Sequence, residues 1–315
     1  MVAPHGTVWL CPGQGAQKVG MGKDLAARFP AAARMFERID GALGFPLSKV
    51  MFEGPEAELT ATHNAQPAIL AHSLAVHAAL GERAGAPAAA LGHSLGEYSA
   101  YVTAGTMTAD EAAKLVRRRG ELMQEAGAAR PGTMAVILGL AAPDVAAACQ
   151  AASANGAVAV PANLNAPDQT VISGDPEAVS KAGDACLARG AKRVLPLKVS
   201  GAFHSPLMAP AANGLRSAVD HATLADPAFP VIANATAEAV TTAARARRLL
   251  VDQLTAPVRW VECVQHAARL VGKDARFIEI GPGAVLAGLL KRIVSEPRVV
   301  SLGTADDVSR FLEAA

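Results

Sequence analysis

Residues 91–100 of this 315-residue chain read Leu91-Gly92-His93-Ser94-Leu95-Gly96-Glu97-Tyr98-Ser99-Ala100. They contain the pattern G-x-S-x-G, which is typical of a nucleophile elbow, a sharp turn between a strand and a helix. Small apolar residues at 88–91 predict the end of a buried strand, and residues 95–104 predict a helix. Such a turn lifts Ser94 out of the backbone at a helix N-terminus, where N–H groups stabilise a developing oxyanion. Taken alone, the pattern also fits a plain Gly/Ser turn.

Strand and helix patterns alternate on both sides of this motif, which favours a mainly parallel α/β sheet. Thr108 and Glu111 have the spacing of a capping box and predict a helix that runs to about Ala126. Proline breaks the first helical stretch at Pro30, and Pro67 is expected in the first turn of the next helix. The other expected elements are strands at 7–11, 231–234 and 276–280, a glycine-rich loop at 12–17, and helices at 23–42, 66–84 and 286–294.

A hinge expected at 127–132 separates this pattern from a unit of different character. The order of elements in that unit is βαββαβ, which is that of a ferredoxin-like fold. Its predicted strands are 133–140, 157–164, 169–173 and 192–197, and its predicted helices are 142–154 and 176–189. The sequence therefore predicts a small domain inserted into a larger α/β domain.

Composition excludes several classes of protein. Hydrophobic residues make up 51% of the chain but aromatics only 4%, so the core is built from Ala, Val and Leu. A net charge of +1 argues against a nucleic-acid-binding protein. Cys11, Cys149, Cys186 and Cys263 form no C-x-x-C pair, which argues against a disulfide framework and a zinc site. The start at 1–6 lacks a signal-peptide pattern and no apolar run reaches membrane-spanning length, so we expect a cytoplasmic protein without membrane contact or metal.

A serine nucleophile needs a base, and His204 is the strongest of eight histidines. It follows the predicted small domain in a loop bounded by Gly201 and Pro206, where catalytic groups tend to lie. His93 is a poor candidate because neighbours along a strand point to opposite faces. No Asp or Glu stands out as a third member, so a Ser–His dyad fits better than an esterase triad. The remaining histidines are read as ordinary surface or core residues: His5, His63, His72, His77, His221 and His266.

Several motifs recur in one order along nearly the whole chain, and together they identify a family. They are Pro12-Gly13-Gln14-Gly15-Ala16-Gln17, Ala65-Gln66-Pro67-Ala68, GHSLGEYSA at 92–100, Arg119-Gly120-Glu121-Leu122-Met123, Asn163-Leu164-Asn165-Ala166-Pro167, Gly201-Ala202-Phe203-His204-Ser205, Gln253-Leu254-Thr255-Ala256-Pro257-Val258-Arg259-Trp260 and Glu279-Ile280-Gly281-Pro282-Gly283. In these motifs the chain resembles the malonyl-CoA:acyl carrier protein transacylases, and it is similar to the acyltransferase domains of polyketide synthases.

The resemblance implies an α/β-hydrolase-like catalytic domain at 1–129 and 199–315 with a ferredoxin-like small domain at 130–198. It implies that Ser94 attacks the thioester and that His204 is the base. The Gln253 backbone carbonyl would orient His204, and the backbone N–H groups of Gln14 and Leu95 would form the oxyanion hole. No cofactor is implied, since phosphopantetheine arrives on the partner.

Arg119 is the residue that the resemblance links to the malonyl carboxylate, which a guanidinium binds bidentately. From the residues alone, positions 117–119 also fit a solvated basic stretch. Helical spacing, however, places Arg119 on one face with Leu115, Leu122 and Met123, where an arginine needs an anion. By holding the carboxylate, Arg119 would also leave poor geometry for hydrolysis. The resemblance adds Phe203, Met123, Gln66 and Asn163 to the substrate site.

Phe203 precedes the histidine and would fill the space of an α-methyl branch, which favours malonyl over methylmalonyl. The chain departs from the malonyl-selective polyketide pattern at Gly201, where that pattern has His, and this weakens assignment to a polyketide subtype.

The implied partners are malonyl-CoA and an acidic acyl carrier protein, and the implied state is a monomer. Alternatives are a discrete acyltransferase that serves a polyketide synthase in trans, or an acyl-thioester hydrolase. Candidate basic contacts for the carrier protein are Arg245, Arg247, Arg248, Lys291, Arg292, Lys192 and Arg193.

Overall fold

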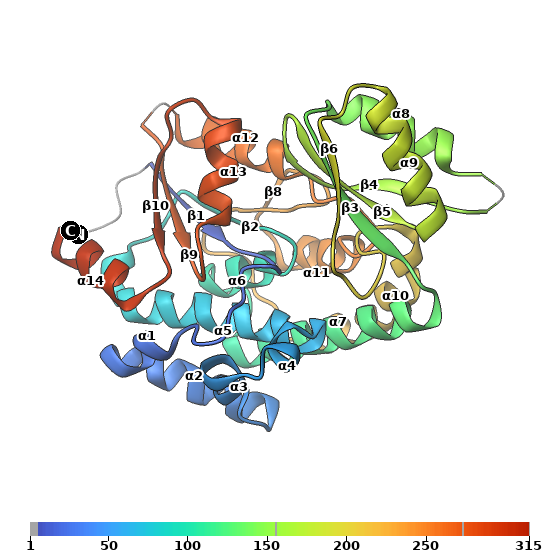
Figure 1. Ribbon diagram of the computed structural model, residues 1–315. Helices are drawn as coiled ribbons and strands as arrows, with labels where there is room; N and C mark the ends of the chain where they lie inside the picture. The colour runs from blue at the N-terminus through green and yellow to red at the C-terminus, as the bar shows by residue number, and fades with distance from the viewer. Residues whose placement is uncertain (1–5, 155, 273, 315) are drawn as a thin grey trace.

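The structure is a computed structural model that describes residues 6–154, 156–272 and 274–314. It is a mixed α/β fold with two separate sheets, and helices pack around both (Figure 1). The expectation for the N-terminal segment falls largely on residues 1–5, which lie outside the described residues.

The larger sheet has six strands in the order β10-β9-β1-β2-β7-β8. All neighbouring pairs are parallel except β7 and β8, which are antiparallel. The strands are β1 (Thr7–Cys11), β2 (Ala89–Gly92), β7 (Val231–Ile232), β8 (Ala239–Val240), β9 (Arg276–Ile280) and β10 (Arg298–Leu302).

Both faces of this sheet are buried, as its short and almost wholly apolar strands predict. Along β1, Val8 and Leu10 join a core cluster with Trp260 of α12, while Trp9 and Cys11 join a larger cluster on the opposite face. The helices around the sheet are α1 (Lys23–Arg28), α2 (Pro30–Leu43), α3 (Leu47–Glu53), α4 (Glu56–Thr60), α5 (Thr62–Leu80), η1 (Gly81–Ala84), α6 (Gly96–Thr103), α7 (Ala109–Ala129), η2 (Pro206–Met208), α10 (Ala209–His221), α11 (Ala243–Asp252), α12 (Trp260–Val271), α13 (Val285–Ile293) and α14 (Ala305–Ala314).

The smaller sheet is antiparallel, with the order β4-β5-β3-β6, and α8 and α9 pack on it (Figure 1). The chain order β3-α8-β4-β5-α9-β6 confirms the expected βαββαβ pattern. Its elements are β3 (Thr133–Leu138), α8 (Ala142–Ala152), β4 (Ala159–Ala166), β5 (Gln169–Gly174), α9 (Pro176–Ala188) and β6 (Arg193–Pro196).

Backbone hydrogen bonds join the small sheet to the rest of the chain. The N–H of Leu164 donates to the carbonyl of Val258 at 2.9 Å, and the N–H of Val258 donates to the carbonyl of Ala162 at 2.8 Å. Strand β4 is thereby held beside the segment that follows Gln253. This contact matters for the site because it fixes the two units against each other next to a functional residue.

Three sequence predictions need correction. Helix α5 begins at Thr62, so Pro67 lies inside the helix and not in its first turn. Proline lacks the N–H that would bond the carbonyl of His63, and the Arg117 side chain donates to that carbonyl instead, at 3.3 Å. Helices α3 and α4 were not expected, and β4 continues through Asn165 and Ala166, which were expected in a loop.

Candidate active site

Ser94 lies at the turn between β2 and α6, as the elbow pattern predicts. Its φ of 53° is in the left-handed region, a strained conformation for a residue with a side chain. The two glycines of the motif are required by close approach. A Cβ on Gly92 would lie 1.9 Å from the backbone carbon of Gly96, and a Cβ on Gly96 would lie 2.1 Å from the carbonyl oxygen of Cys11. Glycine at both positions therefore allows the tight turn that carries Ser94 between β2 and α6.

His204 lies next to Ser94 in the fold, although 110 positions separate the two residues in the chain. The Ser94 Oγ and His204 Nε2 atoms are 2.8 Å apart, and His204 Nδ1 lies 2.9 Å from the backbone carbonyl oxygen of Gln253. A carbonyl only accepts, so Nδ1 carries the proton and Nε2 accepts from the serine hydroxyl. The imidazole is thus oriented by a backbone carbonyl, and none of its described hydrogen-bond partners is a carboxylate.

The electrostatic surroundings keep His204 neutral. Burial lowers its pKa to about 3, and the positive charge of Arg119 acts in the same direction. Only 4% of the residue is exposed. A neutral imidazole at ordinary pH is the form that can take a proton from Ser94.

Arg119 is 1% exposed and points from α7 to the serine. Its Nη2 donates to Ser94 Oγ at 3.0 Å and to Gln253 Oε1 at 2.9 Å, and its Nη1 donates to Gln66 Oε1 at 2.8 Å. The described acceptors of this guanidinium are all uncharged, and its buried Nε has no described partner. A buried cation held by neutral acceptors is well suited to bind an anionic group beside Ser94.

The predicted oxyanion donors reach the elbow by different routes. Leu95 follows Ser94 in the chain, whereas Gln14 comes from the loop after β1, where a Cβ on Gly13 would lie 2.4 Å from the carbonyl oxygen of His93. Within the described residues, the backbone N–H of Gln14 and that of Leu95 have no hydrogen-bond acceptor. The N–H of Ser94 itself is occupied, since it donates to Asn234 Oδ1 at 2.7 Å. Two backbone donors therefore remain for a ligand.

The other expected substrate residues are buried to a similar degree but differ in their contacts. Gln66 donates to Met123 Sδ at 3.3 Å and so brings Met123 next to Arg119. Phe203 is 6% exposed and precedes the base. Among the described residues, Asn163 has no hydrogen bond to the catalytic pair, and its buried Oδ1 has no described partner. Its neighbour Asn165 is the β4 residue that reaches the elbow, where it accepts from His93 Nε2 at 2.8 Å.

Sequence reasoning missed two residues at the site. Asn234 lies just after β7 and donates to the carbonyl of Gly92 at 2.7 Å while it accepts from Ser94, so it holds both ends of the elbow. Glu97 is 1% exposed and lies behind the site. Its place within the quoted motif was a signal for it, whereas nothing in the local pattern singles out Asn234.

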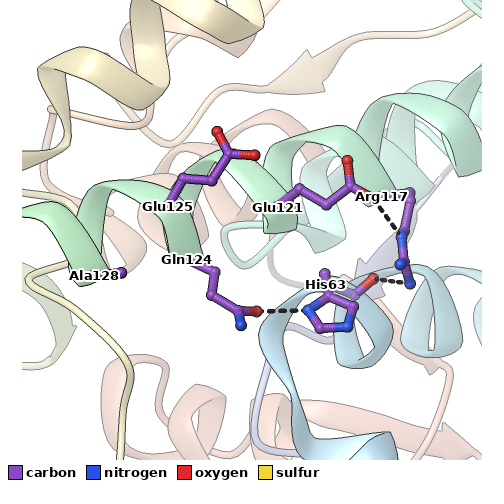
Figure 2. Close-up of a pocket in the computed structure, with 6 residues that line it drawn as sticks. All are labelled: His63, Arg117, Glu121, Gln124, Glu125 and Ala128. Carbon is purple, nitrogen blue, oxygen red and sulfur yellow. Dashed lines mark hydrogen bonds and ion pairs between the residues drawn. The ribbon is translucent and has the colours of Figure 1, made fainter.

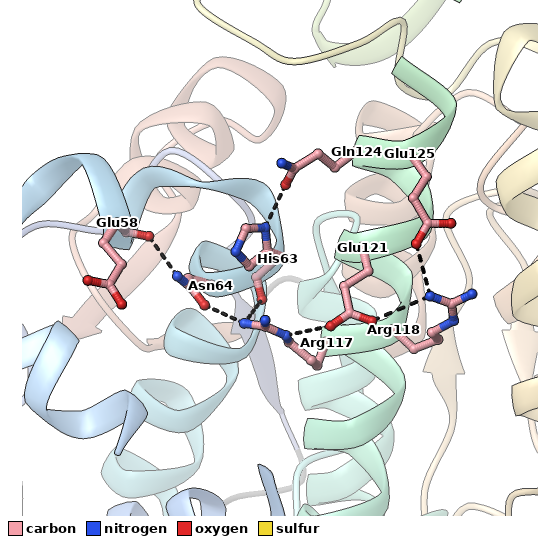
Figure 3. A network of polar contacts seen from close by, with 8 residues as sticks. All are labelled: Glu58, His63, Asn64, Arg117, Arg118, Glu121, Gln124 and Glu125. Carbon is pink, nitrogen blue, oxygen red and sulfur yellow. Dashed lines mark hydrogen bonds and ion pairs between the residues drawn. The ribbon is translucent and has the colours of Figure 1, made fainter. Parts of the chain in front are cut away.

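A polar hollow on the outer side of α7 is distinct from this site (Figure 2). Its lining includes His63, Arg117 and Glu121 but none of the catalytic pair. The charges there satisfy one another: Arg117 donates to Glu121 and Asn64, and Arg118 donates to Glu121 and Glu125 (Figure 3). No charge is left over in this hollow to select a ligand.

Metal ligands, thiols and membrane-spanning helices were considered in the part of the chain that is described. No cluster of three His, Cys, Asp or Glu side chains there has the arrangement of a metal site. The four cysteines are buried and unpaired. Across residues 6–154, 156–272 and 274–314, no helix is both long and apolar enough to cross a membrane.

Comparison with known proteins agrees with this geometry. Residues 8–313 match the acyl transferase domain family, and the chain belongs to that family. It is 43% identical to the malonyl CoA-acyl carrier protein transacylase of Bacillus subtilis (strain 168) over 303 residues, which cover 93% of this chain and 95% of the relative. It is also 43% identical to the protein of that name from Escherichia coli (strain K12) over 306 residues, which cover 97% and 98%.

Solved structures give the same result. One is a type II polyketide synthase acyl-carrier protein in complex with its malonyl-transacylase, with a TM-score of 0.93, 42% identity, and coverage of 98% of this chain and 100% of that one. Another is an acyl carrier protein S-malonyltransferase from Vibrio cholerae O1 biovar eltor str. N16961, with a TM-score of 0.92, 40% identity, and coverage of 96% and 99%.

Proposed function

We propose that this protein moves a malonyl group from malonyl-CoA to the phosphopantetheine thiol of an acyl carrier protein, as an [acyl-carrier-protein] S-malonyltransferase of fatty-acid synthesis. The observation that carries the proposal is the buried Arg119, whose Nη2 lies 3.0 Å from Ser94 Oγ. The Arg119 guanidinium would supply a fixed positive charge for the free carboxylate of a malonyl thioester. The transacylase relatives support the same assignment.

In the first half of the reaction, Ser94 Oγ attacks the thioester carbonyl while its proton passes to His204 Nε2. The carbonyl oxygen becomes an oxyanion that the N–H groups of Gln14 and Leu95 would receive. When the intermediate collapses, the C–S bond breaks, and His204 returns the proton to the departing coenzyme A thiolate. The product is a malonyl ester on Ser94.

In the second half, the pantetheine thiol takes the place of coenzyme A. Its proton passes to His204, its sulfur attacks the ester carbonyl, and the Ser94 oxygen leaves with the proton from His204. The base ends each half-reaction neutral, which suits a histidine whose pKa is held low. Ser94 and His204 therefore serve both half-reactions of a double displacement.

The malonyl carboxylate would replace Ser94 Oγ as an acceptor from Arg119 Nη2 and would accept a second bond from the unpartnered Nε. This bidentate ion pair leaves the hydrogen bonds of Arg119 to Gln66 and Gln253 in place. Gln66 and Met123 lie beside this guanidinium and would line the acyl site. We place Phe203 against the α-carbon of the acyl group, and we assign the unpartnered Oδ1 of Asn163 to a polar group of the substrate.

An acidic carrier protein would dock on free positive charge. Several candidates are already engaged: Arg245 by Glu238, Arg247 by two backbone carbonyls, and Arg292 by Asp168 and Gln169. Lys192, Arg193, Arg248 and Lys291 are exposed and have no described acidic partner. We prefer Lys192 and Arg193 because they are adjacent at the start of the edge strand β6. Such docking would be weak and sensitive to salt.

We further propose a cytoplasmic monomer that needs no cofactor and no metal and binds neither nucleic acid nor membrane. Its architecture would be an α/β-hydrolase-like domain at 1–129 and 199–315 with a ferredoxin-like insert at 130–198. The order β4-β5-β3-β6 of the insert supports that description.

The first experiment is intact-protein mass after brief exposure to malonyl-CoA, with acetyl-CoA and methylmalonyl-CoA in parallel. A chase with holo acyl carrier protein follows. We expect a malonyl adduct that is absent in Ser94→Ala and that moves to the carrier protein. An adduct lost to water would point to a hydrolase, and its transfer only to a polyketide carrier protein would favour the trans-acting acyltransferase, which the polyketide neighbour makes a second candidate.

A further inference from the structure

Glu97 is a buried carboxylate behind the catalytic pair that the chemistry above does not use. Only 1% of the residue is exposed. Its Oε2 accepts from Gln253 Nε2 at 2.8 Å and from the N–H of Asn234 at 2.8 Å. Its Oε1 has no described partner. A carboxylate buried this fully needs a reason, because burial disfavours its charge.

The side chain of Gln253 joins Glu97 to Arg119. Its amide nitrogen donates to Glu97 and, at 3.1 Å, to the backbone carbonyl of Ser94, while its amide oxygen accepts from Arg119 Nη2 at 2.9 Å. An amide is donor on one side and acceptor on the other, so Glu97, with the shorter of these two bonds, and the Ser94 carbonyl together determine which side faces the guanidinium. If the amide flipped, its NH₂ group would face another donor.

Glu97 performs this role whether or not it is ionised. Burial raises its pKa to about 7, against the hydrogen bonds from Asn234 and Gln253 and the charge of Arg119. A proton would go to Oε1, the oxygen without a described partner, and Oε2 would still accept. The hydrogen bond to Gln253 therefore persists in both states.

We propose that Glu97 is a positioning residue for acyl selection: through the Gln253 side chain it holds the Arg119 guanidinium over Ser94 Oγ, where the acyl carboxylate is received. The proposal rests on the proposed malonyl transfer. His204 is oriented by the backbone of Gln253, whereas Arg119 is oriented by the side chain. Gln253 thus orients the base through its backbone carbonyl and the carboxylate-binding arginine through its side chain.

A double-mutant cycle tests this arrangement. The rates of Ser94 acylation by malonyl-CoA and by acetyl-CoA are measured in wild type, Glu97→Ala, Gln253→Ala and the double variant. Gln253→Ala keeps the carbonyl that holds His204 and removes only the side-chain link. We expect each single change to lower the malonyl-to-acetyl ratio about tenfold, and the double change to lower it no further. Multiplied effects in the double variant, or an unchanged ratio in folded Glu97→Ala, would overturn the proposal.

Glu97→Gln and Glu97→Asp sharpen the test. The glutamine keeps an acceptor oxygen at the same place, so its ratio should stay within about twofold of wild type. The aspartate keeps the carboxylate but withdraws it from Gln253 by one methylene, so its ratio should fall towards that of Gln253→Ala. If Glu97→Ala does not fold, Glu97→Asp replaces it in the cycle with the same expectation.

Glu279 supplies a matched control. It is equally buried, and it accepts from the N–H groups of Leu286 and Ala287 at 3.0 Å and from Ser301 Oγ at 2.9 Å. Glu279→Gln should lower the melting temperature without changing the malonyl-to-acetyl ratio. If the wild-type protein forms no malonyl adduct, the proposed function is wrong. If it forms the adduct but the Glu97 variants keep the wild-type malonyl-to-acetyl ratio, only the positioning role of Glu97 is wrong.

Discussion

Two neighbouring arginines on α7 have opposite surroundings. The side chain of Arg118 is 45% exposed and is paired with Glu121 and Glu125 on the outer face of the helix (Figure 3). Arg119 is 1% exposed, and its described acceptors are uncharged. An exposed arginine paired with carboxylates contributes little to binding, whereas a buried one held by neutral groups keeps its charge for a ligand. A shift of one position along the helix therefore separates an exposed, ion-paired arginine from a buried one that is available to a ligand.

Removing each arginine in turn should give the largest contrast. Arg119→Ala should lower the rate of Ser94 malonylation at least about 100-fold, because it deletes the partner of a buried charge. Acetyl transfer should change far less. The rates of adduct formation by intact mass measure both.

Arg118→Ala is the matched control, and it should keep malonylation within about twofold of wild type. In Arg119→Ala we also expect more of the acyl group to be lost to water relative to transfer. Equal losses of malonyl and acetyl transfer would show that Arg119 supports the fold and not the choice of substrate. An unchanged ratio of transfer to hydrolysis would remove its protective role.

The buried surroundings of Arg119 include His204, and we expect the low pKa of this histidine to affect how stability depends on pH. The pKa of His204 is about 3 in the folded protein, below its ordinary value of 6.5. The unfolded chain therefore takes up a proton that the folded protein refuses, and stability falls as pH drops from 6.5 towards 3. At pH 5 this amounts to roughly 2 kcal/mol.

His204→Gln removes that proton uptake. The variant should therefore lose less stability than wild type between pH 7 and pH 5, by the same roughly 2 kcal/mol. Urea unfolding at the two pH values measures it. Parallel losses in the two proteins would mean that the imidazole is not held neutral.

The smallest effect is expected at the N-terminus of α7, about three turns from the two arginines. Thr108 Oγ1 accepts from the N–H of Glu111 at 3.2 Å, and the Glu111 carboxylate accepts from the N–H of Thr108 at 3.4 Å. Thr108→Ala should lower the free energy of unfolding by about 1 kcal/mol. The malonyl-to-acetyl ratio should not change, since Arg119 lies about three turns along the helix. A changed ratio would mean that loss of the capping box alters the position of Arg119 at the active site.

Much of the fold was predictable because its signals are local. The elbow at Ser94, the capping box at Thr108 and the βαββαβ order of the small unit each depend on residues close together in the chain. Pro67 was misplaced because the group that replaces its missing hydrogen bond, Arg117, comes from another helix. The need for glycine at position 92 was predictable for the opposite reason, because the backbone that it approaches, at Gly96, lies in the same turn.

The site itself divides in the same way. The sequence alone determined that Ser94 would stand on a strained turn, and helical spacing placed Arg119 on an apolar face. Only the tertiary structure decided what the two would meet: a carbonyl of Gln253 for His204, an amide of Gln253 for Arg119, and Asn234 and Glu97 behind them. These contacts join residues up to 156 positions apart. No local pattern encodes them, because a hydrogen bond between distant segments exists only once packing brings its donor and acceptor together.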